Sequence, residues 1–225
     1  METNKIYNQI KILDLHSHSF MSDGIATPTE LIRYAQVAGY TAFSITDHVD
    51  LTNYKQVINN ILSLKDINFH SLVFIPGIEI THVLPDDISI IVDYARKMGI
   101  KWIGVHGETP VEPVIKGTNL AAIESRVDFL AHPGFITGIE LKLAVTNNVW
   151  LELTMRSGHS LSNGFVYQKG KNIGINFIIS SDAHKTSDLF NKELYVATAL
   201  GSGMTKDELL YHNNNFYNHI MNNLL

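Results

Sequence analysis

DLHSHSFMSDG, residues 14–24, follows an apolar run and decides the fold of this chain. His16 and His18 stand two residues apart, so in a strand both imidazoles point to the same face. Asp23 follows five residues after His18, and Gly24 then lets the chain turn. Imidazole and carboxylate ligands together suit Zn, Fe or Mn. The stretch alone fits a solvated polar strand end equally well, so the rest of the chain has to distinguish these two interpretations.

The composition indicates one folded domain with a full core. The chain has 225 residues, of which 45% are hydrophobic and 17% are charged. It contains no cysteine, which excludes disulfides and thiolate metal sites and makes a cytoplasmic location the default expectation. The chain has no run of 18 apolar residues, so no membrane span is predicted. Its N-terminus has no apolar segment, so no signal peptide is predicted. A net charge of −5 with only four arginines argues against long nucleic acids as partners.

Strand-like and helix-like segments alternate about seven times along the chain. The expected strands cover residues 11–18, 41–47, 72–80, 102–106, 127–131, 149–154 and 175–180. The expected helices cover residues 27–39, 52–67, 85–99, 119–125, 136–147 and part of 164–173, with one or two more in 189–225. This alternation predicts a parallel sheet. An open dinucleotide-binding sheet would place a glycine-rich turn where HSHSFMSDG stands, so we predict a barrel instead.

The whole chain, residues 1–225, is predicted to form this single barrel domain. Residues 1–9 and about 212–225 are expected at its periphery, and the asparagine-rich tail is expected to be frayed.

Metal-ligand side chains recur at the carboxyl end of nearly every expected strand, which is the face where barrel active sites lie. They are His16, His18 and Asp23 after the first strand, His48, Glu79, His106 and His132 after the next four, and Asp182 and His184 after the last. Six imidazoles and three carboxylates are too many for one ion, since a catalytic zinc needs about three protein ligands. Two or three divalent ions fit this set. Three such ions against three carboxylates leave a charge of about +3, which attracts phosphate and lowers the pKa of bound water toward ~7.

These motifs resemble those of the PHP (polymerase and histidinol phosphatase) superfamily. DLHSHSFMSDG, ITDH, PGIEI, VHGE, LAHPG and SSDAH occur in family order over about residues 12–184. The resemblance implies a distorted (β/α)7 TIM-like barrel with a trinuclear centre of Zn, Mn or Fe. It also implies three ligand sets: His16, His18, Glu79 and Asp182 for one ion; Glu79, His106 and His132 for the second; and Asp23, His48 and His184 for the third.

Several further residues admit two interpretations. Arg156, after the sixth strand, either clamps a substrate phosphate or pairs with a surface acid. Glu108, two residues after His106, either orients that imidazole or serves as an acid or base, or else is an ordinary loop carboxylate. Glu152 is expected to be a structural hydrogen-bonding group inside the barrel. The remaining polar residues near strand ends, Lys185, His82 and His159, are expected to be ordinary loop residues rather than site residues.

The sequence therefore predicts a metal-dependent phosphoesterase in which Glu79, Asp182, Arg156 and Glu108 take part in catalysis. A metal-bound hydroxide would attack a small phosphomonoester, and the resemblance makes L-histidinol phosphate a leading substrate. The first alternative is an exonuclease or nucleotide phosphodiesterase of the same superfamily. A non-catalytic subunit of an RNA-processing assembly and a metal-dependent amidohydrolase are weaker alternatives. The oligomeric state is not predicted.

Overall fold

Seven parallel strands follow one another in a single sheet in this computed structural model, which describes residues 3–225 and their side chains from residue 6 onward. The strands are β1 (Leu13–Asp14), β2 (Ala42–Ile45), β4 (Val73–Ile80), β5 (Trp102–His106), β6 (Phe129–Ala131), β7 (Trp150–Thr154) and β8 (Phe177–Ser180). Each pairs in parallel with the next, and the two-residue β3 (His48–Val49) pairs with β4. All seven expected strands are confirmed, whereas β3 was not predicted.

The sheet is nearly closed into a barrel by the segments that leave its two terminal strands. Ser17, after β1, forms a parallel bridge with Ala183, after β8. His18 donates its backbone N–H to the carbonyl of Ala183 at 2.7 Å, and Asp182 donates to the carbonyl of His16 at 3.1 Å. The barrel prediction is therefore confirmed. The expected first strand, residues 11–18, is wrong in length: regular pairing with β2 stops at Asp14, because the chain turns toward β8 beyond it.

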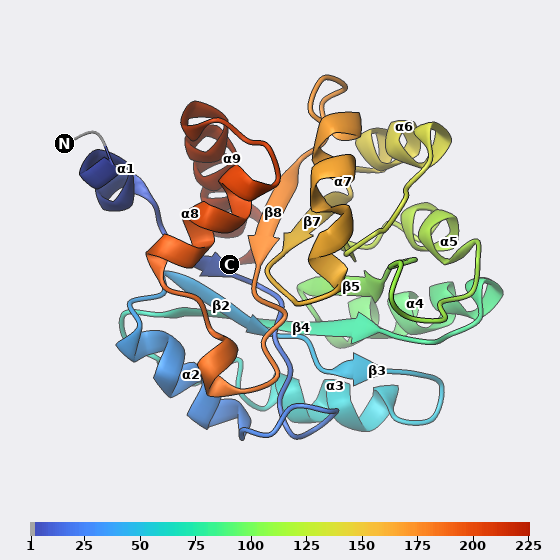
Figure 1. Ribbon diagram of the computed structural model, residues 1–225. Coiled ribbons are helices and arrows are strands. Elements are labelled where there is room, and N and C mark those ends of the chain that lie inside the picture. Colours follow the sequence, from blue (N-terminus) through green and yellow to red (C-terminus); the bar gives the residue numbers. More distant parts are fainter. Residues whose placement is uncertain (1–2) are drawn as a thin grey trace.

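Helices surround the sheet (Figure 1). They are α1 (Thr3–Gln9), α2 (Pro28–Val37), α3 (Tyr54–Leu62), α4 (Ile88–Met98), α5 (Thr118–Glu124), α6 (Gly138–Asn147), α7 (Asn163–Gly170), α8 (Lys192–Gly201) and α9 (Lys206–His219). Short 3₁₀ turns cover Pro85–Asp87, His159–Ser162 and Thr186–Asp188, and Ile220–Leu224 is one turn of π-helix. Thr27 caps α2 with Glu30 in a reciprocal capping box, which fixes where the first helix of the barrel begins. None of the described helices has the length and hydropathy needed to cross a bilayer.

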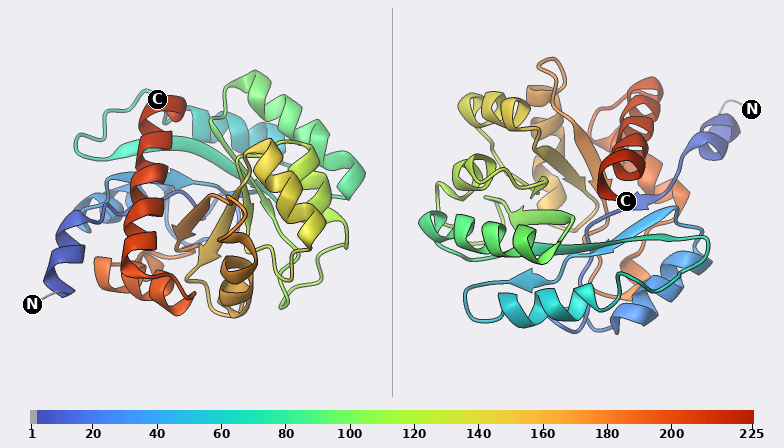
Figure 2. Two further views of the ribbon diagram at one scale, coloured as in Figure 1. Left: turned by 90° about the horizontal axis from the view of Figure 1, so that it is seen from above. Right: turned by 180° about the vertical axis from the view of Figure 1, so that it is seen from behind.

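The C-terminal segment closes the floor of the barrel. Figure 2 shows α9 running alongside the barrel, and it contacts β1 and β8. Phe216, Ile220 and Leu224 recur every four residues and pack in one buried cluster with Trp102 and Phe129. The expectation of a peripheral, frayed tail over residues 212–225 is therefore wrong, because this apolar stripe lies hidden among asparagines. Of the other peripheral segment, 1–9, residues 1 and 2 lie outside the described residues.

Candidate metal centre

All nine predicted ligands meet at the carboxyl end of the barrel. They form overlapping groups whose ligand atoms lie within 4.8 Å of one another: His18 with Asp23, His48 and His184; His16 with His18 and Glu79; and His48 with Glu79 and His106. A fourth group joins His132 and Asp182 to His159. Residues from six separate strand ends thus converge on one place, which makes it a site able to hold metal ions.

Glu79, at the end of β4, lies at the middle of the centre. Its Oε2 lies 3.2 Å from Nε2 of His16 and 3.0 Å from Nδ1 of His48. Its Oε1 faces the other way, 3.4 Å from Nδ1 of His106 and 3.7 Å from Nε2 of His132. Because the two oxygens serve two different sets of imidazoles, this carboxylate has the arrangement that a bridge between two ions requires.

Asp182 supplies the second buried carboxylate. Its Oδ1 lies 3.1 Å from Nε2 of His18 and 3.7 Å from Nε2 of His16, whereas Oδ2 faces Nε2 of His132 at 3.8 Å. We call His16, Glu79, His132 and Asp182 the inner group; all four are at most 3% exposed. The inner group forms the floor of the site.

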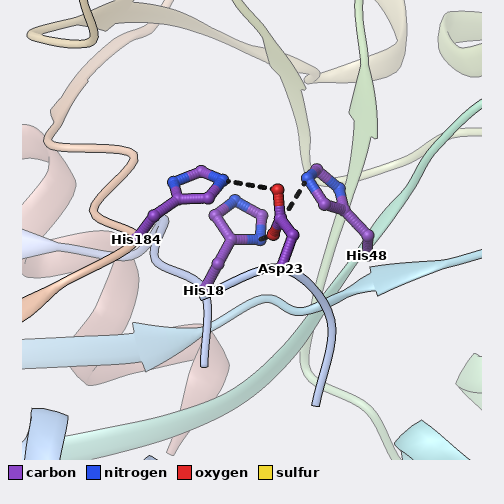
Figure 3. Close-up of side chains that lie close together, drawn as sticks. All are labelled: His18, Asp23, His48 and His184. Carbon is purple, nitrogen blue, oxygen red and sulfur yellow. Dashed lines mark ion pairs between the residues drawn. The ribbon is translucent and has the colours of Figure 1, made fainter. Parts of the chain in front are cut away.

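The outer group consists of Asp23, His48 and His184. Figure 3 shows Asp23 between the two imidazoles, with His18 beneath them. Oδ2 of Asp23 lies 3.0 Å from Nε2 of His184, and its Oδ1 lies 3.6 Å from Nε2 of His48. The side chains of Asp23, His48 and His184 are 53%, 22% and 14% exposed. These three side chains therefore form a solvent-facing ligand set that adjoins the inner group.

Local backbone geometry aims two of the inner ligands. His132 and Asp182 directly follow or closely follow β6 and β8, and both have positive φ, 26° and 52°. Residues other than glycine rarely adopt this region, and such outliers concentrate at functional sites. The chain thus leaves each strand in a conformation that turns the ligand over the barrel mouth.

Glu152, on β7, supports the inner group from below. Its Oε1 lies 2.6 Å from Nδ1 of His16 and also accepts the hydroxyl of Ser180. Its Oε2 accepts the backbone N–H of His132 at 2.8 Å. A carboxylate that accepts from Nδ1 of His16 leaves Nε2 of that ring free to bind a metal. The structural role expected for Glu152 is confirmed, and the contact gives it a share in orienting two ligands.

Burial and neighbouring charges raise the pKa values of some ligands and lower those of others. Burial acts to raise the pKa of Glu79, but the imidazoles of His16 and His48 outweigh it and lower that pKa well below its usual value. Burial raises the pKa of Asp182 to about 6. Burial also lowers the pKa of His18 and of His132 well below the usual histidine value, and neighbouring imidazoles add to this effect. His18 and His132 are therefore neutral at pH 7, the form that binds metal.

The donor set fits divalent cations. Several of its buried atoms have no hydrogen-bond partner among the described residues: both carboxylate oxygens of Glu79, and Nδ1 of His18, His106 and His132. Unpartnered buried polar atoms are costly in a folded protein. Imidazole nitrogens and carboxylate oxygens are ordinary ligands for Zn, Mn and Fe. Bound metal ions would therefore supply partners for these buried polar atoms.

The structure corrects the role predicted for Glu108. Its Oε1 accepts backbone N–H groups from Gly117 at 2.8 Å and Asn119 at 3.1 Å, at the start of α5. Oε1 of this carboxylate is therefore committed to a helix end, and no contact with His106 is found among the described residues. Glu112, which the sequence analysis did not single out, lies 3.0 Å from Nε2 of His106.

His159 was expected to be an ordinary loop histidine, and this expectation is wrong. It is 5% exposed, and its ring stacks on that of His132 with centroids 4.1 Å apart. Its Nε2 lies 3.3 Å from Oε1 of Glu112. The sequence gives one signal for it: His159 follows the only strand whose end carries no predicted ligand.

A cavity of about 300 Å³ opens above the ligands, and Arg156 forms part of its wall. Arg156 lies 3.7 Å from Asp188 and also borders a neighbouring groove of about 560 Å³. Lys185 borders the groove as well and pairs with the same carboxylate at 3.6 Å. Both cations thus stand at the rim of the centre.

The fold and the ligand set define a barrel whose carboxyl end carries a site able to hold metal ions. The chain belongs to the PHP domain family, whose model matches residues 14–221.

Two relatives illustrate its place among known proteins. The chain is 38% identical to uncharacterized protein MJ1295 of Methanocaldococcus jannaschii, over 87% of this chain and 92% of that protein. It is 27% identical to the DNA polymerase/3'-5' exonuclease PolX of Bacillus subtilis, over 86% of this chain but 37% of that longer protein.

Solved structures share the fold at low identity. Histidinol phosphate phosphatase of Lactococcus lactis, solved with zinc, L-histidinol and phosphate, superposes with a TM-score of 0.58 at 15% identity, covering 87% of this chain and 95% of that chain. The ochratoxinase of A. niger gives 0.59 at 13% identity, covering 90% of this chain and 69% of that one. Enzymes with different substrates thus share this architecture, so the substrate has to be argued from the site.

Proposed function

We propose that this protein is a metal-dependent phosphoesterase that hydrolyses a small phosphomonoester, in the manner of a histidinol phosphatase. The observation that carries the proposal is the pair of buried carboxylates, Glu79 and Asp182, each facing imidazoles on two sides beneath an open cavity. Such a pair calls for more than one divalent ion, and a cluster of divalent ions suits phosphate better than an uncharged substrate.

Two to three ions, of Zn, Mn or Fe, would be held by the inner group, His18, His106 and the outer group. When bound, they would neutralise phosphate oxygens and make water acidic enough to supply a nucleophile at neutral pH. The protein orients these ligands through Glu152 and keeps the inner carboxylates away from bulk water. Arg156 is suited to hold a phosphate oxygen at the rim, because its guanidinium is always charged and lies beside the cavity.

The size of the site supports a small substrate. The cavity of about 300 Å³ and the adjoining groove of about 560 Å³ are of the order that small-molecule ligands occupy. The structural neighbour from Lactococcus lactis was solved with L-histidinol and phosphate, which makes an amino-alcohol phosphate the leading candidate. The leaving alcohol would lie in the groove and the phosphate over the inner group.

The decisive experiment combines a metal analysis with a substrate panel. Purified protein, loaded with Mn²⁺ or Zn²⁺, is assayed against L-histidinol phosphate, p-nitrophenyl phosphate and bis-p-nitrophenyl phosphate. We expect bound metal and preferential cleavage of monoesters. Protein that binds no metal, or binds metal but cleaves none of these esters, would overturn the proposal. His70→Asn is a matched control, since His70 lies outside the site and asparagine tolerates its positive φ of 57°.

A second candidate, an exonuclease or nucleotide phosphodiesterase, is favoured by the likeness to PolX. The net charge of −5 and the four arginines count against a long polyanion. The diester and a short oligonucleotide in the same panel separate the two candidates. Preferential hydrolysis of the oligonucleotide, with activity falling steeply as salt rises, would favour the exonuclease.

A further inference from the structure

Glu112 connects the metal centre to the long loop between β5 and α5. Its Oε2 lies 3.0 Å from Nε2 of His106, and its Oε1 lies 3.3 Å from Nε2 of His159. A single carboxylate therefore faces two imidazoles that come from different strand ends.

The two nitrogens of His106 face different partners. Nδ1 lies 3.4 Å from Oε1 of Glu79, on the side of the ligand cluster, and neither ring nitrogen of His106 meets hydrogen-bond geometry with a described residue. Nε2 points the opposite way, toward Glu112. In the neutral form of His106 that binds metal, an Nε2–H directed at Glu112 leaves the lone pair on Nδ1, where the ligand cluster is. A carboxylate behind a ligating histidine commonly fixes the tautomer in this way.

His159 holds Glu112 in place from the other side. Its Nδ1 lies 2.8 Å from the hydroxyl of Thr109, which leaves Nε2 for the carboxylate of Glu112. The ring is 5% exposed and stacks on His132, the neighbour of His106 in the centre. Both imidazoles that face Oε1 of Glu79 are thus backed by the same small network.

We propose that Glu112 is a positioning residue for metal binding at the His106–His132 side of the centre, with His159 as the brace that holds its carboxylate. The proposal rests only on the metal-binding part of the proposed function and not on the substrate. It gives the loop of residues 107–117 a role in metal binding, because this loop carries Glu112.

The same loop provides a matched control. Glu108 lies four residues before Glu112, and it caps α5 through Gly117 and Asn119 without reaching a ligand. Glu108→Gln and Glu112→Gln make the same chemical change in the same loop. Only Glu112→Gln removes the charge behind His106. Because Glu112 is 37% exposed, its substitution leaves no buried cavity that would unfold the barrel.

The test measures metal affinity in the full-length protein. Wild type, Glu112→Gln, His159→Gln and Glu108→Gln are stripped, titrated with Zn²⁺ against a chromophoric chelator, and loaded with Co²⁺ for visible spectroscopy. We expect Glu112→Gln to lower the binding affinity for one ion by about 10–100-fold, while the other ions keep their affinity. Its Co²⁺ spectrum should change, His159→Gln should show a smaller loss at the same ion, and Glu108→Gln should match wild type.

Two results would overturn this proposal alone: unchanged affinities and spectrum in Glu112→Gln, or equal losses in Glu108→Gln and Glu112→Gln, which would mean a general effect on the loop. Wild-type protein that takes up no metal at all would overturn the proposed function as well.

Discussion

The inner and outer groups of the metal centre use the same side-chain types but are supported in different ways. The inner His16 is fully buried and held by the buried carboxylate of Glu152, whereas Asp23 in the outer group has a side chain that is 53% exposed. Asp23 accepts a hydrogen bond from the hydroxyl of Ser22 at 3.3 Å, and Asp47, which accepts from Ser19 and Ser22, shapes the loop that carries it. From this difference we expect the inner group to hold its ions firmly and the outer group to exchange its ion more readily.

Removing an inner ligand should have the largest effect. We expect His16→Ala, and likewise Asp182→Ala, to lower phosphomonoester hydrolysis by about a thousandfold or more, because several kcal/mol of charge stabilisation is lost and 1.36 kcal/mol corresponds to tenfold. Bound metal should fall in parallel while circular dichroism still reports a folded barrel. Full activity in either variant would mean that the inner group has been assigned wrongly.

Glu152→Gln tests the support of the inner group rather than a ligand. Glu152 receives the backbone N–H of His132, the hydroxyl of Ser180 and Nδ1 of His16, so an amide NH₂ in its place must face at least one donor. We expect inner-group metal affinity to fall by about 10–100-fold. Ser180→Ala removes one donor and keeps the carboxylate, so it should have a much smaller effect. Equal effects of the two variants would refute an orienting role for Glu152.

The pH dependence of metal loading should distinguish His18 and His132, which are already neutral, from His106, which is not. Burial acts to lower the pKa of His106, but Glu112 and Glu79 outweigh it and raise that pKa to about 10. In the metal-free protein His106 is therefore protonated at pH 7, and an ion has to displace this proton. His18 and His132, with lowered pKa values, release none.

Affinity at the His106 side should accordingly rise about tenfold per pH unit from pH 7 toward 10, with one proton released per ion. The sign is fixed, because a raised pKa favours the protonated state that competes with the metal. Calorimetry in two buffers of different ionisation enthalpy counts the proton. A binding enthalpy that does not depend on the buffer would contradict the protonation state assigned to His106.

The barrel and the meeting of the nine candidate ligands at one end of it were predictable because their signals are local. Apolar runs of strand length end in histidine, aspartate or glutamate, and parallel strands bring their carboxyl ends to one face. His16 and Glu79 could therefore be placed together although 63 residues separate them in the printed numbering. The parallel order of the strands confirms that inference.

Most of what the sequence did not reveal depends on irregular backbone. Glu112 lies in a loop with no periodicity, and only the folded course of that loop brings it, rather than Glu108, to His106. β3 is two residues long, too short for a strand pattern. Phe216, Ile220 and Leu224 did carry a helical period, but the polar residues between them concealed it.

The smallest effect is expected from the outer group. Asp23→Asn keeps the shape of the side chain but removes the charge that faces His184 at 3.0 Å. The electrostatic attraction for an ion at the outer group is therefore weaker. We expect that ion to be lost on dialysis while the inner ions stay, and activity to fall by about tenfold, or ~1.4 kcal/mol.

Asp50→Asn makes the same change on the same cavity wall, where the carboxylate is already bound to Thr52, and should leave metal content unchanged. The comparison between the two groups depends on the order in which their ions are released. As the chelator concentration is raised, the outer ion of the wild-type protein should leave first. If Asp23→Asn strips every ion and matches His16→Ala in activity, the two groups form one cooperative unit. The exposure of Asp23 would then say nothing about how firmly its ion is held.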